Sequence, residues 1–84
     1  MNQTTPSHRT AVTSKLLKSV GYDVELAVLE VEFHDGVVWQ YPGVTQKENE
    51  ELMAAKSIGG HFLKHIKPKF GKAAVKVPPQ EVQS

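Results

Sequence analysis

The sequence of 84 residues contains no cysteine, and this absence excludes disulfide bonds, thiolate zinc sites and a cysteine nucleophile. Aromatic residues are also few, with three Phe, two Tyr and one Trp, so the chain can bury only a modest core. No run approaches the roughly eighteen apolar residues that span a bilayer, and the polar residues 1–13 lack the apolar stretch of a signal peptide. We therefore expect one small, compact domain in the cytoplasm.

The net charge of +1 conceals two segments of opposite sign. Residues 23–51 carry eight acidic residues and one lysine, which gives a net charge of −7. Residues 56–76 carry six lysines and no acidic residue, which gives a net charge of +6. The second segment is therefore a candidate anion-binding surface. Its lysines are Lys56, Lys64, Lys67, Lys69, Lys72 and Lys76.

Apolar residues in alternation indicate three strands in the first half of the chain. Residues 14–22 predict a short edge strand. Residues 24–33 alternate apolar with acidic side chains at period two, which is typical of a half-buried strand. A His-Asp-Gly turn at 34–36 and the β-branched and aromatic residues 37–41 then predict a β-hairpin.

Two registers of this hairpin place Trp39 and Tyr41 on different faces. A two-residue Asp-Gly loop pairs them with Glu32 and Glu30 on the charged face, where they could stack on a ligand. A three-residue loop with a left-handed glycine places them with the core, and we favour this register because it gathers the large apolar residues on one face. A rim position with one exposed edge also fits it, because Trp and Tyr rarely bury their polar tips completely. The pairs of this register are Val31 with Trp39 and Leu29 with Tyr41.

Two short helices are predicted after the hairpin. Thr45 is followed three residues later by Glu48, which is the pattern of a capping box and indicates a helix start. Ser57 is a candidate cap for a second helix, and Pro68 is expected to end that helix. The apolar stripe of the second helix consists of Phe62, Leu63 and Ile66.

The predicted fold class is α+β, with a small antiparallel sheet of about three strands, a hairpin meander, packed by two short C-terminal helices. Residues 1–12 show no periodicity and are predicted to form a flexible N-terminal arm. Residues 13–70 are predicted to form the folded domain. Residues 71–84, basic and containing Pro78-Pro79, are predicted to form a flexible tail that becomes ordered only when bound.

A succession of motifs runs through the predicted domain: Ser14, Val20-Gly21-Tyr22-Asp23, Leu29-x-Val31-x-Phe33, Gly36, Trp39-x-Tyr41, Ala55-x-Ser57-x-Gly59 or Gly60, Phe62 and Ile66. This succession resembles the KTSC domain, named for the C-terminal extension of some lysyl-tRNA synthetases, over about residues 12–70. The Tyr-x-Tyr motif of such domains stands here as Trp39-Gln40-Tyr41. The resemblance implies a compact α+β module, attached to a synthetase or alone in bacteria and phages, for which RNA binding has been suggested. The tryptophan weakens any role that needs a hydroxyl there and strengthens a stacking role.

The lysines are the strongest functional signal, because neutralising phosphates requires several cations on one side of a molecule. Lys64, Lys67 and Lys69 are the best placed. Gly59 and Gly60, at a helix start, could present backbone N–H groups to an anion, or they could simply let the helices turn and pack tightly. We favour the packing role, although both can hold at once.

Other candidate chemistries have less support. His61 and His65 stand four residues apart and could present two imidazoles to a metal, but no carboxylate lies near them in the sequence. We expect surface histidines, of which His61 contacts a ligand phosphate, and neither a metal nor another cofactor. The serines lack a nucleophile context, and Glu30 with Glu32 reads as the solvent-facing side of a strand, so no enzymatic activity is expected.

The first functional hypothesis is a non-enzymatic binding module for RNA or another phosphate-bearing nucleotide ligand. A related version is an oligomer that sequesters a small nucleotide signal in pockets between subunits. The alternative is a protein–protein interaction or structural module whose acidic and basic faces pair between copies or with a partner. No membrane partner is expected. The ligand-binding residues of the first hypothesis are Trp39, Tyr41, Gly59, Gly60, His61, Lys64, Lys67 and Lys69.

Overall fold

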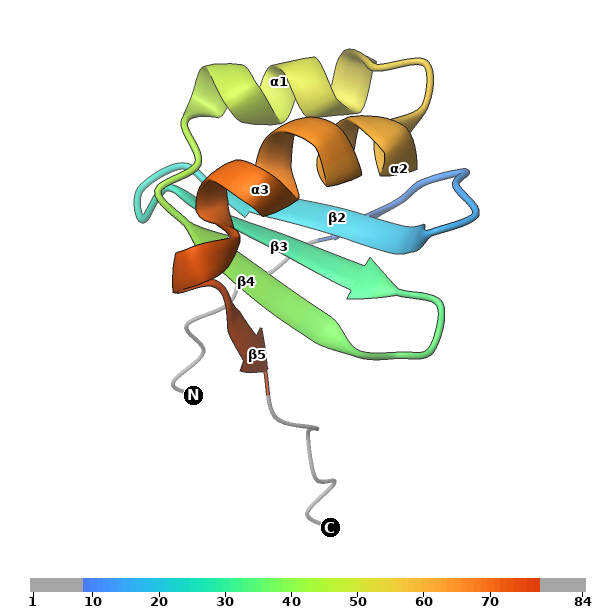
Figure 1. Cartoon of the computed structure of the whole chain (residues 1–84), viewed down its shortest axis with the longest axis horizontal. Helices are drawn as coiled ribbons and strands as arrows, with labels where there is room; N and C mark the ends of the chain where they lie inside the picture. The colour runs from blue at the N-terminus through green and yellow to red at the C-terminus, as the bar shows by residue number, and fades with distance from the viewer. Residues whose placement is uncertain (1–8, 78–84) are drawn as a thin grey trace, which may run out of the picture.

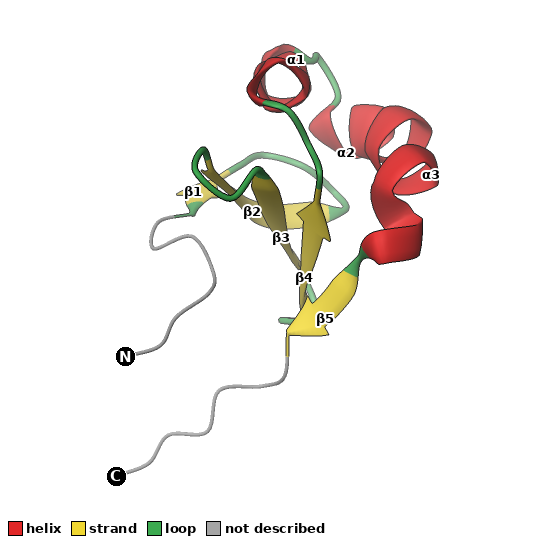
Figure 2. Cartoon of the chain, turned by 90° about the vertical axis from the view of Figure 1, so that its left-hand side faces the viewer, coloured by secondary structure: helices red, strands yellow, loops and turns green. Residues whose placement is uncertain are grey.

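The computed structural model describes residues 9–77, so most of the predicted arm and the end of the predicted tail lie outside the described residues. A curved antiparallel sheet carries the helices on one of its faces (Figures 1 and 2). The elements, in chain order, are β1 (Thr10–Ala11), β2 (Leu17–Asp23), β3 (Val28–Phe33), β4 (Val38–Pro42), α1 (Gln46–Ala54), α2 (Ile58–His61), the π-helix η1 (Phe62–Ile66), α3 (Lys67–Phe70), the 3-10 helix η2 (Gly71–Ala73) and β5 (Val75–Val77).

The described sheet has five strands, where the sequence predicted about three, and its order is β1-β2-β3-β4-β5. The two additional strands are its edges. β1 comes from the predicted arm and β5 from the predicted tail, and both are too short to show a period in the sequence. Because β1 pairs with β2, the stretch predicted as an edge strand lies inside the sheet. β5 follows the helices and returns to pair with β4 (Figure 2).

The hairpin of β3 and β4 has the register that the apolar pattern favours. Val31 lies opposite Trp39, and Leu29 lies opposite Tyr41. Gly36 adopts a φ of 88°, and the Phe33 N–H donates to the Val37 carbonyl at 2.9 Å, which closes a three-residue loop. The prediction of the three-residue turn is therefore confirmed. Both aromatic side chains face the helices.

The strand before this turn is shorter than the period-two pattern indicated, because it begins at Val28 and not at Val24. The four residues before it form a turn. The carboxylate of Asp23 accepts a hydrogen bond from the Leu26 N–H at 3.0 Å, and Ala27 has a left-handed φ of 56°. The local hydrogen bond that the Asp23 side chain accepts competes with the strand ladder here, so the alternation of the sequence starts four residues before the strand does.

Both predicted helix starts are present. The Thr45 hydroxyl accepts from the Glu48 N–H at 3.2 Å, and the Glu48 carboxylate accepts from the Thr45 N–H at 3.1 Å, which completes the capping box of α1. The Ser57 hydroxyl accepts from the Gly60 N–H at 3.1 Å and caps α2.

Pro68 does not end the second helical segment, in contrast to the prediction. The segment continues through Phe70 into η2. In an uninterrupted α-helix the proline ring would clash with the Lys64 carbonyl, four residues earlier. The π-helical turn η1, in which the Lys67 N–H donates to the Phe62 carbonyl, widens the helix directly before the proline. Pro68 then stands in the first turn of α3, where a missing N–H is tolerated.

The core lies between the sheet and the helices. Phe62 is fully buried, and its ring meets Tyr41 edge-on at a centroid distance of 5.3 Å and Phe33 at 5.9 Å. None of the helices described in residues 9–77 is long and apolar enough to cross a membrane. The buried apolar residues are Leu17, Val20, Leu29, Val31, Tyr41, Val44, Leu52, Phe62 and Ile66.

The sheet face opposite the helices holds a network of polar side chains. Glu30, expected to face solvent, is fully buried there and forms an ion pair with Arg9. Gln40 also donates to its carboxylate, at 3.1 Å. The neighbouring Glu32 accepts from the Ser19 hydroxyl at 2.8 Å. The solvent-facing expectation is wrong for Glu30 because Arg9, just before β1, lies against it.

Candidate ligand-binding pocket

An apolar pocket of about 260 Å³ lies between the helix-facing side of β4 and the helical segment that follows α2. It brings together three of the predicted ligand-binding residues, Trp39, Tyr41 and Lys67, which are up to 28 positions apart in the sequence. The residues that line it are Leu16, Phe33, Trp39, Tyr41, Phe62, Leu63, Lys67, Gly71 and Ala74.

The alternation of β4 positions the two aromatic residues of the pocket. Trp39 and Tyr41 stand two residues apart and therefore share the helix-facing side, while Gln40 between them faces the polar network. Tyr41 is 4% exposed, and this burial raises the pKa of its phenol. Trp39 is half-buried beside the core. Tyr41 therefore forms the closed end of the pocket, and Trp39 presents the more accessible ring.

The helical side of the pocket combines apolar, small and basic residues. Phe62 and Ile66 turn into the core, and Leu63 and Lys67, the next residues along the helix, consequently lie at the rim. Leu63 remains 49% exposed. Gly71 lines the same space with almost no side-chain volume. Among the residues that line the pocket, Lys67 alone carries a charge at neutral pH.

The predicted glycine pair does not reach this pocket, and both glycines have structural roles. A Cβ atom on Gly59 would stand 2.9 Å from the Ser14 hydroxyl oxygen and 3.1 Å from the Leu16 Cβ, so the chain packs too closely there for a side chain. The Gly60 N–H is already used in the cap by Ser57. The packing role is therefore the one that the geometry of the pair supports.

His61, predicted to contact a ligand phosphate, and its neighbour His65 lie outside the pocket as well. The rings of His61 and His65 lie next to each other at a centroid distance of 4.5 Å, tilted by 42° between their planes. Within residues 9–77, no group of three or more His, Asp or Glu side chains is arranged to hold a metal ion. Lys64 is exposed on the same helical segment and does not line the pocket.

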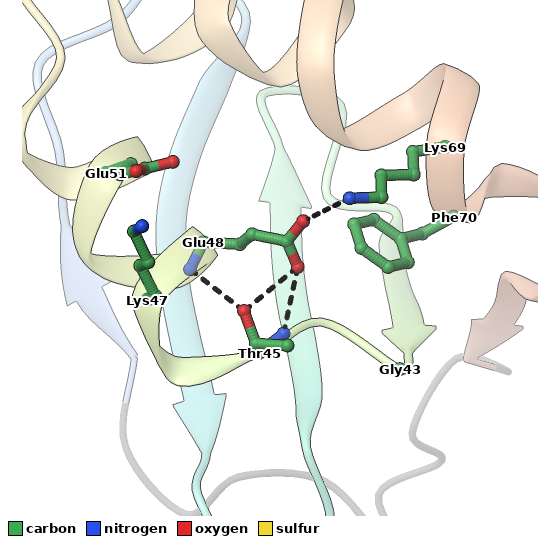
Figure 3. Close-up of a pocket in the computed structure, with 7 residues that line it drawn as sticks. All are labelled: Gly43, Thr45, Lys47, Glu48, Glu51, Lys69 and Phe70. Carbon is green, nitrogen blue, oxygen red and sulfur yellow. Dashed lines mark hydrogen bonds and ion pairs between the residues drawn. The ribbon is translucent and has the colours of Figure 1, made fainter.

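Lys69 belongs to a second hollow, of about 390 Å³, on the side of the segment that faces α1 (Figure 3). Its ammonium group donates to the Glu48 carboxylate at 2.6 Å. This hydrogen bond, with one from the Thr45 backbone, lowers the pKa of Glu48. The ion pair of Lys69 and Glu48 joins α3 to α1 across this hollow. The other two charged residues of its lining, Lys47 and Glu51, have opposite signs, so the hollow has no net charge to attract an anionic ligand. The hollow is lined by Gly43, Thr45, Lys47, Glu48, Glu51, Lys69 and Phe70.

Sequence reasoning missed most of the apolar lining of the 260 Å³ pocket. Phe62 and Leu63 were identified as a helical stripe, a signal for packing and not for a ligand. Gly71 and Ala74 fall in the segment predicted as a tail, and they line the pocket because β5 returns to β4. Leu16 precedes β2 and has no motif of its own.

The fold is that of a small α+β domain, an antiparallel sheet with helices and an aromatic pocket on one face. The chain belongs to the KTSC domain family, because the model of that family matches residues 13–70. A KTSC domain protein of known crystal structure, YPO2434 from Yersinia pestis, is similar with a TM-score of 0.79 and 34% identity, over 84% of this chain and 97% of that one. An uncharacterized protein of Stutzerimonas stutzeri is 42% identical over 60 residues, which are 71% of this chain and 84% of that protein. A lysine–tRNA ligase of Nostoc punctiforme is 38% identical over 55 residues, which are 66% of this chain but only 10% of the ligase.

Proposed function

We propose that this chain is a non-enzymatic binding module for a phosphate-bearing nucleotide, either free or within RNA. The base enters the aromatic pocket and stacks on Trp39, and the phosphate meets Lys67 at the rim. The observation that carries the proposal is that one pocket combines an accessible tryptophan ring with one cation. Aromatic rings hold bases by stacking, which contributes about 1–3 kcal/mol per base, and lysine neutralises phosphate.

The distribution of ion pairs supports an anionic ligand. Three of the acidic residues are used inside the chain, since Arg9 pairs with Glu30 and Glu32, and Lys69 pairs with Glu48. The other lysines of the basic segment have no ion-pair partner among residues 9–77, and all of them are exposed. The basic segment thus stays available to phosphates, whereas pairing between copies, the alternative function, has fewer free carboxylates than the sequence suggests. These lysines are Lys56, Lys64, Lys67, Lys72 and Lys76.

The size and lining of the pocket support a single ring system as the group that enters. Its volume of about 260 Å³ lies just below the roughly 300–1,000 Å³ typical of sites that enclose a small molecule. None of the residues that line it in the described chain is Asp, Glu, His, Ser or Thr. The lining therefore offers stacking and one positive charge, and its groups able to transfer a proton are the buried Tyr41 phenol, whose pKa is raised by burial, and the Lys67 ammonium. A lining with neither carboxylate nor imidazole among its described residues favours binding over catalysis.

The relative named as a lysine–tRNA ligase supports RNA as one source of the nucleotide. By its name that enzyme acts on an RNA, and it contains a segment similar to this domain. The segment is a small part of the enzyme, so the support concerns a binding contribution and not the ligase reaction.

Fluorescence of Trp39 provides a direct test, because it is the sole tryptophan of the sequence and lies in the pocket. The purified protein would be titrated with the four ribonucleoside 5′-monophosphates and with short single-stranded oligoribonucleotides, at low and at high salt. We expect saturable quenching and an affinity that falls as salt rises. The variant Lys67→Gln should bind more weakly than wild type. Lys56→Gln, which removes the same charge from an exposed residue that does not line the pocket, is the matched control.

Two results would contradict the proposal. The first is the absence of any change in Trp39 fluorescence with every nucleotide and oligonucleotide, under conditions where circular dichroism shows a folded protein. The second is equal weakening by Lys67→Gln and Lys56→Gln, which would assign the affinity to net charge and not to the pocket.

A further inference from the structure

The strand β5 places a second cation next to the pocket, on the same face of the sheet as Trp39. Lys76 lies directly opposite Trp39 in the ladder of β4 and β5. Opposite residues of an antiparallel pair point to the same face, with their Cβ atoms about 4.5–5.5 Å apart. Ala74, two residues before Lys76 and in extended conformation, lines the pocket and shares that face. Lys76 therefore lies beside Trp39, at the edge of the pocket that β5 forms.

The pocket is consequently flanked by cations on two different elements. Lys67 stands on the helical side, at the start of α3, and Lys76 stands on the strand side, opposite Trp39 in the ladder of β4 and β5. Both side chains are exposed, and neither has an ion-pair partner in the described part of the chain. A lysine ammonium is a point charge on a flexible stem, so each of them can meet a phosphate without a fixed geometry.

Cations on two sides of one stacking ring match a particular kind of nucleotide. A nucleoside monophosphate carries phosphate on one side of its sugar and can use only one of the two lysines. A nucleotide inside a strand has a phosphate on its 5′ side and another on its 3′ side. Resting on the proposed function, we infer that the pocket takes a splayed-out internal nucleotide of a single-stranded nucleic acid, with its base on Trp39 and its two flanking phosphates on Lys67 and Lys76.

The experiment compares ligands that present one or two phosphates to the same pocket. Trp39 fluorescence would be titrated with adenosine 5′-monophosphate, with adenosine 3′,5′-bisphosphate and with a trinucleotide that has adenine in its centre, each in ribose and deoxyribose form. We expect the bisphosphate and the trinucleotide to bind roughly tenfold more tightly than the monophosphate, because they add one charge-assisted contact. The two sugar forms separate RNA from DNA as the natural source.

Variants of the two lysines test the division of roles. Lys67→Gln and Lys76→Gln should each reduce the slope of log affinity against log salt by about 0.7 for a longer single strand, the value expected for one phosphate contact. For the monophosphate, only one of these two substitutions should matter. Lys56→Gln is the control for the loss of one charge, and thermal unfolding checks that each variant keeps its fold.

The outcomes separate this inference from the proposed function. If the monophosphate binds as tightly as the bisphosphate and the trinucleotide, or if Lys76→Gln behaves as wild type with a single strand, the two-phosphate inference is wrong while nucleotide binding stands. If no ligand changes the fluorescence, both are wrong. Tighter binding of the bisphosphate together with a reduced salt slope in both lysine variants supports the inference.

Discussion

Lys69 on α3 donates a hydrogen bond of 2.6 Å to the carboxylate of Glu48 in the first turn of α1 (Figure 3). The same carboxylate accepts the Thr45 N–H at 3.1 Å and closes the capping box. One side chain therefore starts a helix and also joins it to another helix. The pairing uses one residue from the acidic segment and one from the basic segment, so part of the charge segregation of the sequence stabilises the fold of a single chain.

The first prediction concerns the charge of Glu48. The hydrogen bond from Lys69 is the main reason that its pKa lies below the ordinary value of 4.5 in the folded protein. A lowered pKa contributes stability that is present above the ordinary value and is lost as pH falls through the lowered one. Glu48→Gln, which keeps the geometry of the capping box, should reduce the free energy of unfolding at pH 7 by about 0.5–1 kcal/mol. In urea unfolding experiments the difference from wild type should shrink steadily below pH 4.5.

Glu51→Gln provides the control for this substitution, because Glu51 lines the same hollow and has no ion-pair partner within residues 9–77. Glu51→Gln should unfold as wild type does at pH 7 and at pH 3. A stability loss in Glu48→Gln that is equally large at pH 3 would show that the charge of Glu48 is not its cause.

The second prediction concerns the close packing at Gly59. Its added Cβ would stand 2.9 Å from the Ser14 hydroxyl oxygen, so Gly59→Ala should destabilise the domain by about 1–3 kcal/mol. At Gly71 a Cβ would meet the Lys67 Cγ at 3.8 Å, an ordinary contact, so Gly71→Ala should be neutral or stabilising by up to about 1 kcal/mol. Thermal unfolding followed by circular dichroism measures both. Equal stability of the two variants would refute the packing role of Gly59.

The third prediction concerns the buried carboxylate of Glu30. Arg9→Ala removes its charged partner and leaves a fully buried side chain with only the hydrogen bond from Gln40. We expect a loss of about 1–3 kcal/mol, below the usual cost of breaking a buried pair because the Arg9 side chain is 32% exposed. The double variant Arg9→Ala with Glu30→Gln should recover part of the loss in chemical unfolding. An Arg9→Ala protein as stable as wild type would show that the pair does not hold β1 in place.

The local features of the fold were predictable because they depend on residues close together in the chain. The three-residue turn at Gly36 follows from the apolar residues of two strands, which must share one face, and from one permissive glycine. The capping box joins Thr45 to Glu48, only three residues later. The edge strands were not predictable in this way. Two or three residues show no period, and β5 forms only because the helical segment ends beside β4.

The same distinction applies to the candidate site. Trp39, Tyr41 and Lys67 could be proposed from residue type and segment charge, and the pocket contains all three. The small residues that leave the space open could not be proposed, since their role depends on where β5 returns. The burial of Glu30 could not be predicted from the sequence either, because its partner Arg9 stands 21 positions away in a segment without a periodic pattern.

The last prediction fills the pocket without altering its charge. Ala74 is half-buried and lines the pocket, whereas the adjacent Ala73 is exposed in η2 and does not line it. A leucine at position 74 occupies the space that a base would need, so Ala74→Leu should abolish nucleotide-dependent quenching of Trp39, while Ala73→Leu should bind as wild type does. Thermal unfolding should show both variants folded, with Ala74→Leu changed by less than about 1.5 kcal/mol because it enters existing space. If Ala74→Leu kept wild-type affinity for a nucleotide, the ligand would bind elsewhere, and the exposed lysines without the aromatic pocket would have to account for the affinity.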